Sequence, residues 1–172
     1  MENNDVINTI ITRRSIRKYT GRKVSEEQVE LLLKAAMFAP SAVNKQPWHF
    51  IVMRQKVFLK KIMEVHPNSK MLNEANVAIL VCGDYELVHA PGYLPLDCSA
   101  ATQNILLAAH SLGLGAVWIG IHPREDRINC LKEIFKLPES IHPFSIISIG
   151  YPAEKKMIPK RFDTKRIHYD SW

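Results

Sequence analysis

The chain has 172 residues, the size of one ordinary domain, and 47% of them are hydrophobic, enough to build a core. Lys and Arg number 23 against 17 Asp and Glu, and the net charge of +6 would suit nucleic acid, an acidic membrane surface or a phosphorylated small molecule. The three cysteines are scattered and odd in number, which argues against a disulfide framework and for a reducing compartment.

The sequence carries no sign of export or of a membrane anchor. Met1–Asp5 lacks the pattern of a secretory signal, and the most apolar run, Val77–Cys82, is too short to cross a bilayer. We therefore expect a soluble cytoplasmic protein. Neither a repeat nor a Pro/Gly/Ser linker divides the chain, so residues 1–172 are expected to form one domain.

Helices and strands are expected to alternate along the chain. Ser25 and Gln28 form the pattern of a helix-opening capping box, and Gly113 suits the left-handed position after a helix. Periodicity predicts helices over 6–11, 25–39, 57–65, 97–112 and 124–135, and strands over 48–54, 77–83, 116–120 and 145–150. The tail from Tyr151 has little periodicity and is expected to run extended over a surface. This order predicts helices and sheet stacked in three layers.

The segment RRSIR, residues 13–17, places three guanidinium groups and one hydroxyl within five residues. Arginine offers paired donors in a fork that fits the oxygens of a phosphate dianion. In an extended conformation side chains alternate, so Arg13, Ser15 and Arg17 would share one side. Arg14 would then point to the other side. The segment predicts a phosphate site, with a solvated basic turn or a nonspecific nucleic-acid patch as alternatives.

The loop APSAVNKQPWHF, residues 39–50, carries side-chain amides at Asn44 and Gln46. An amide provides both donors and acceptors, which suits the alternating carbonyl and N–H groups of a flavin's pyrimidine edge. The loop could bind such an edge, or it could be an ordinary helix-to-strand connection, in which Asn and Pro are common.

The segment GLGAVWIG, residues 113–120, differs from the GxGxxG fingerprint and leads into a strand rather than out of one. A Rossmann-type dinucleotide site is therefore disfavoured. Gly120, at the end of the predicted strand, would instead let the backbone approach a flat ligand closely.

Together these segments resemble the nitroreductase family of FMN-dependent enzymes. The resemblance spans essentially the whole chain, in the family's order, through RRSIRKY, APSAVNKQPWHF, DCSAATQNILLAAHSLGLGAVWIG and IGYPAEKKMIPKRF. It implies an α+β, three-layer fold whose central sheet is mixed, mostly antiparallel, and flanked by helices. It also implies an intertwined homodimer in which the tail, residues 151–172, wraps the partner subunit.

The resemblance implies roles at the two ends of FMN. Arg13, Arg14 and Ser15 would contact the phosphate and the ribityl chain. Lys160 and Arg161 of the tail would complete the phosphate site.

The ring would be held by residues from separate segments. Arg17 would reach its pyrimidine end, where a cation stabilises the charge that develops on reduction. Pro40 and Ser41 would pack along the ring's edge. Asn44 and Gln46 would bond its pyrimidine or ribityl groups.

The strand end Trp118, Ile119 and Gly120 would face the ring, with a backbone N–H near N5. A hydride would pass from NADH or NADPH to FMN, and a nitroaromatic or quinone acceptor would then take the electrons. No catalytic side chain is expected, because the cofactor carries the chemistry. No metal is expected either, because the seven histidines lack the paired spacing of a zinc site.

Other functions remain open at this point. A specialised relative could dehalogenate, dehydrogenate or break down a flavin, and a non-catalytic module could bind flavin without turnover. The short connection over residues 84–96 would leave the flavin face open, which makes the acceptor hard to infer. We expect neither nucleic acid nor membrane as a partner.

Overall fold

The computed structural model describes residues 5–172, so residues 1–4 of the expected domain lie outside it. Within that range four strands form one antiparallel sheet in the order β1-β2-β4-β3. The strands are β1 Trp48–Met53, β2 Val77–Asp84, β3 Gly115–Gly120 and β4 Ile141–Gly150.

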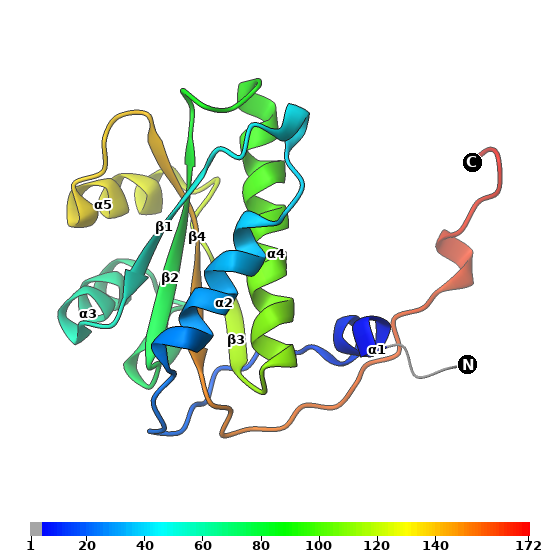
Figure 1. Cartoon of the computed structure of the whole chain (residues 1–172), viewed down its shortest axis with the longest axis horizontal. Coiled ribbons are helices and arrows are strands. Elements are labelled where there is room, and N and C mark those ends of the chain that lie inside the picture. Colours follow the sequence, from blue (N-terminus) through cyan, green and yellow to red (C-terminus); the bar gives the residue numbers. More distant parts are fainter. Residues whose placement is uncertain (1–4) are drawn as a thin grey trace.

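Helices cover both faces of this sheet, as Figure 1 shows. Helices α2 (Glu26–Met37) and α4 (Leu94–Ser111) lie on one face, and α3 (Lys56–Val65) and α5 (Glu125–Phe135) lie on the other. The predicted α+β, three-layer class is confirmed. The sheet was expected to be mixed; among the described residues, its one parallel pairing is the bridge between Ser15 and Ala116.

The hydrophobic core has two parts, one on each face of the sheet, and strand β2 contributes to both. It is buried along its whole length, as its continuous apolar run predicts. Alternate side chains of a strand point to opposite faces, so Ile79 and Val81 join the core under α2 and α4. Ala78 and Leu80 join the second core, under α3 and α5.

Local signals set the helix ends. The Ser25 hydroxyl accepts the Gln28 N–H at 3.1 Å and the Gln28 side chain accepts the Ser25 N–H at 3.0 Å, which confirms the capping box. Gly113, just after α4, has a φ of 72°, a conformation that glycine adopts at little cost. Among the described helices, none is both long and apolar enough to span a bilayer.

Two elements start several residues earlier than periodicity predicts. Helix α4 begins at Leu94 rather than Asp97, because Pro95 lies in its first turn, where its missing N–H costs nothing. Strand β4 begins at Ile141 rather than Ser145 and includes Pro143. That proline pairs with Cys82 where the β2–β4 register shifts, an irregularity at which a strand tolerates proline.

Helix α1 (Asp5–Thr12) and the tail lie outside the three layers (Figure 1). No residue of α1 is buried, and Ile10 and Ile11 are about half exposed. In the tail, Phe162 is 83% and Trp172 100% exposed. An apolar surface of this kind indicates a site for another protein surface.

We predict that Gly83→Ala destabilises the fold. A Cβ at this position would lie 2.5–2.7 Å from three side-chain carbons of Leu94, which is fully buried and therefore has little room to move. Overpacking of this kind costs about 1–3 kcal/mol of unfolding free energy, measurable by urea denaturation. Gly92→Ala is the matched control, since its Cβ would meet no atom within 4 Å. Equal stability of the two variants would contradict the prediction.

We also predict that the free energy of unfolding decreases as the pH is lowered, because of His110. This residue joins α4 to α1 through a 2.8 Å contact with the Thr12 hydroxyl. Burial lowers the pKa of His110 from 6.5, and the guanidiniums of Arg13 and Arg14 lower it further. Below about 6.5 the unfolded chain then binds the proton more readily, so stability is lost as pH falls.

The check is the urea midpoint at pH 7.5 and pH 5.5. We expect the urea midpoint to decrease less between pH 7.5 and pH 5.5 in His110→Gln than in the wild type. His168→Gln, in the exposed tail, should retain the wild-type drop; equal drops in all three proteins would contradict the prediction.

Candidate functional site

The arginine segment, residues 13–17, lies along the outer edge of β3. The Ile16 N–H donates to the Ala116 carbonyl at 3.0 Å, beside the parallel bridge from Ser15. Along an antiparallel strand, every second residue directs its N–H and C=O to the same side. Trp118 and Gly120 therefore direct theirs to the outer edge as well, beyond the part that the arginine segment covers.

A cavity of about 370 Å³ lies at this edge, a size within the usual range for small-molecule sites. It brings together Arg17, Trp118, Ile119 and Gly120, four residues that sequence reasoning assigned to one site. The remaining lining residues are His66, Asn68, Met71, Val117 and Arg127. The described lining thus holds two guanidiniums and no carboxylate, which favours an anionic or electron-rich ligand.

A second basic group lies where the tail meets the end of α1. Lys160 and Arg161 line a cavity of about 610 Å³ together with Arg14. Arg13 lies close by: burial lowers its pKa, and the neighbouring charges of Arg14 and Arg161 lower it further. Within residues 5–172 none of these arginines forms an ion pair with a carboxylate. Such a cluster suits a phosphate dianion.

Arg14 has its own partners within this cluster. Its guanidinium donates to the carbonyls of Met157 at 3.2 Å and of Ile11 at 2.6 Å, and also to that of Arg13. The side chain therefore ties the tail to the end of α1. Its contact with a phosphate stays a prediction.

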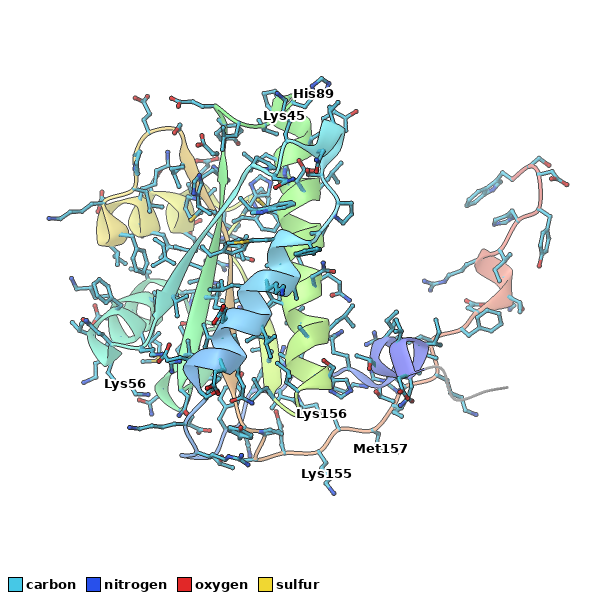
Figure 2. All side chains as sticks on the ribbon, in the orientation of Figure 1. Lys45, Lys56, His89, Lys155, Lys156 and Met157 are labelled. Carbon is cyan, nitrogen blue, oxygen red and sulfur yellow. The ribbon has the colours of Figure 1, made fainter. Side chains whose placement is uncertain are left out.

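The second predicted segment lies at the other end of the molecule. Figure 2 shows Lys45 of the loop near one end of α4, and Lys156 and Met157 of the tail beyond the other. The loop bonds α4 at Asp97, whereas Thr12, the residue just before the arginine segment, bonds it at His110. At about 1.5 Å per residue, these two anchor points are about 20 Å apart. Within one chain, the described linings of the two arginine cavities contain none of the loop's predicted residues, Pro40, Ser41, Asn44 and Gln46.

This loop is held in a strained conformation. Val43, Asn44 and Gln46 have φ angles of 50°, 55° and 51°, in the left-handed region that β-branched residues in particular avoid. The Ser41 hydroxyl accepts the Gln46 N–H at 2.9 Å, and the Gln46 amide donates to the Asn44 carbonyl oxygen at 2.9 Å. Strain braced in this way is typical of functional loops.

The loop is also anchored from α4. The Ala42 N–H donates to a carboxylate oxygen of Asp97 at 3.0 Å, and Asp97 is itself buried. The residues expected to meet a ligand, Ser41, Asn44 and Gln46, remain partly or fully exposed. The loop therefore presents polar groups outward on a fixed support.

Sequence reasoning missed three residues at the end of β3. The Asn68 N–H donates to Nδ1 of His66 at 3.2 Å, so Nε2 of His66 carries the proton and donates to the Gly120 carbonyl at 3.0 Å. Arg127 donates to the same carbonyl at 2.8 Å. These residues come from the end of α3 and the first turn of α5, and no local pattern in the sequence marks them.

Comparison with known proteins identifies the family of the chain. A sequence model described as the nitroreductase family matches residues 10–66 and 59–151. A protein of Methanothermobacter thermautotrophicus is 54% identical over 168 residues, which cover 98% of this chain and 88% of that protein. One of Archaeoglobus fulgidus is 49% identical over 172 residues, covering 98% and 99%. The name of each proposes NADH dehydrogenase/NAD(P)H nitroreductase activity.

Solved structures show the same fold. A Parabacteroides distasonis protein whose name proposes the same activity has a TM-score of 0.94 and 40% identity, covering 99% of this chain and 100% of that one. A Desulfovibrio desulfuricans protein, solved in complex with FMN and whose name proposes nitroreductase activity, has a TM-score of 0.87 and 32% identity, covering 99% of each chain. The basic edge of β3, the tail beside α1 and these matches lead to one conclusion: the chain belongs to the nitroreductase family.

Proposed function

We propose that this protein binds FMN between two copies of the chain and uses NADH or NADPH to reduce nitroaromatic, quinone or related acceptors by a ping-pong mechanism. The observation that carries the proposal is the 370 Å³ cavity, in which Arg17 meets the end of β3 without a carboxylate. Relatives support it: a Bacillus subtilis protein, 29% identical over 187 residues, is named an NAD(P)H-dependent FMN reductase.

The positive charge of the residues present suits the phosphate and the reduced ring of FMN. Arg13, Lys160 and Arg161 would hold the phosphate, and Arg14 would keep the tail in place for them through its bond to the Met157 carbonyl. Ser15, within the arginine segment, would contact the phosphate or the ribityl chain.

At the ring, the outward peptide groups of Trp118 and the N–H of Gly120 would offer hydrogen bonds to a flat edge, and Ile119 lines the same cavity. Arg17 would place its charge at the pyrimidine end. When bound, FMN supplies the two-electron chemistry, so the protein needs to bind, orient and exclude water rather than provide a nucleophile.

The proposal requires a second subunit, because the strained loop lies about 20 Å along α4 from the arginine segment. We infer that Pro40, Ser41, Asn44 and Gln46 reach the ring from the partner in a homodimer. The exposed apolar residues of α1 and of the tail would then be covered, with residues 151–172 wrapping the partner. Three free cysteines are consistent with a cytoplasmic location, and neither nucleic acid nor a membrane is needed.

The test is an absorbance spectrum of the purified protein followed by anaerobic titration. We expect a flavin spectrum that NADH or NADPH bleaches and that a quinone or nitroaromatic restores. Protein that stays colourless after FMN is added would refute cofactor binding. Bound flavin that neither nucleotide bleaches would instead indicate a flavin-binding module without turnover.

Two variants separate the ends of the site. Arg13→Ala removes a charged phosphate contact worth about 1.5–3 kcal/mol, so the Kd for FMN should rise about 10- to 100-fold with the reduction rate of bound FMN retained. Arg17→Ala should also slow that reduction, measured by anaerobic stopped-flow. Equal affinity loss with unchanged reduction rates in both variants would contradict this division of roles.

A shared site also predicts complementation between subunits. Arg13→Ala impairs the arginine half of each site, and a double variant, Asn44→Ala with Gln46→Ala, impairs the loop half. When the two variants are co-expressed and mixed dimers are isolated with two affinity tags, one site per dimer combines both intact halves. We expect that site to bind FMN with wild-type affinity, giving half the wild-type stoichiometry. Mixed dimers without a wild-type site would place both halves in one chain.

A further inference from the structure

Arg127 is the residue at the end of β3 to which sequence reasoning assigns no role. It lies in the first turn of α5 and lines the 370 Å³ cavity with Arg17. Its Nη1 donates to the Gly120 carbonyl at 2.8 Å. Its Nε is buried, and among the described residues it has no hydrogen-bond partner. The side chain is therefore held at the strand end although its own hydrogen bonds are incomplete.

The Gly120 carbonyl accepts from two donors of different charge. His66 donates through Nε2 at 3.0 Å while its Nδ1 accepts the Asn68 N–H, so this ring binds as the neutral tautomer. Arg127 supplies the positive charge. Two donors, one just after α3 and one in α5, fix the orientation of this carbonyl and with it the end of β3.

Arg127 also adds charge to a cavity that lacks a counterion. Arg17 and Arg127 both line it, and its described lining contains no carboxylate. The neighbouring arginine, Arg124, differs: it pairs with Asp126 at 3.5 Å and its side chain is 63% exposed. Two like charges in one cavity repel until an anion joins them, and the repulsion is stronger away from water.

We propose that Arg127 is a positioning and charge-stabilising residue of the flavin site, which holds the end of β3 through Gly120 and favours reduced over oxidised FMN. The inference rests on the FMN binding proposed above. Reduction adds negative charge at the pyrimidine end of a flavin, and a second cation in the same cavity stabilises that charge. Arg127 thereby raises the midpoint potential of the bound cofactor beyond what Arg17 alone provides.

The experiment measures the midpoint potential of bound FMN, together with the Kd for oxidised FMN by fluorescence quenching. Arg127→Gln removes the charge but keeps an amide donor for the Gly120 carbonyl, and Arg127→Lys keeps the charge. Arg124→Gln is the matched control, because it removes one charge from the same helix end outside the cavity. Arg127→Met replaces Arg127→Gln if that variant does not fold, as judged by circular dichroism.

We expect Arg127→Gln to lower the affinity for reduced FMN at least tenfold more than the affinity for oxidised FMN. For a two-electron couple, this lowers the midpoint potential by about 30 mV. Arg127→Lys and Arg124→Gln should stay close to the wild-type potential. An unchanged potential in Arg127→Gln overturns the inference, and so does an equal fall in all three variants. If the wild type binds no FMN, the proposed function fails instead; FMN binding with an unaffected Arg127→Gln is a failure of this inference only.

Discussion

The site depends on one attachment, the bond from the Ile16 N–H to the Ala116 carbonyl at the edge of β3. It turns a basic turn of the chain into a partial edge strand. The approach is close: a Cβ on Gly115 would lie 2.6 Å from a side-chain carbon of Ile16, so glycine is needed there. Because the attachment ends at Ala116, it leaves the outward peptide groups of Trp118 and the Gly120 N–H to a ligand, while His66 and Arg127 hold the Gly120 carbonyl. Arg17 and the strand end then share one cavity.

The arginines beside this attachment form one cluster of positive charge with Arg161 of the tail. Arg13 and Arg14 both lie near Arg161 of the tail, and three backbone carbonyls hold the guanidinium of Arg14. Like charges gathered without carboxylates destabilise the free protein and favour a bound anion. The loop with Val43 and Asn44 in left-handed conformations likewise stores strain in a segment that is expected to meet the ligand.

Much of the fold could be predicted because its signals are local. The run Val77–Gly83 is apolar without a break, as expected of a strand covered on both faces. The Ser25–Gln28 box opens α2 by bonds between residues three apart. The starts of α4 and β4 could not be predicted in the same way. Proline usually ends a helix or a strand, but Pro95 and Pro143 lie at positions that tolerate it. Pro95 lies in the first turn of α4, and Pro143 lies at the register shift between β2 and β4.

The sequence by itself determined the chemistry available: the guanidiniums of residues 13–17, the amides of Asn44 and Gln46, and a glycine where β3 ends. It also carried the resemblance to the family. Only the tertiary structure decided which of these groups share a cavity, because pairing of distant strands and helices sets their distances. It joined Arg17 to Gly120, turned Arg14 toward the tail and added Arg127 from another helix. It also left the amide loop at the far end of α4, since a stiff helix separates the two anchor points.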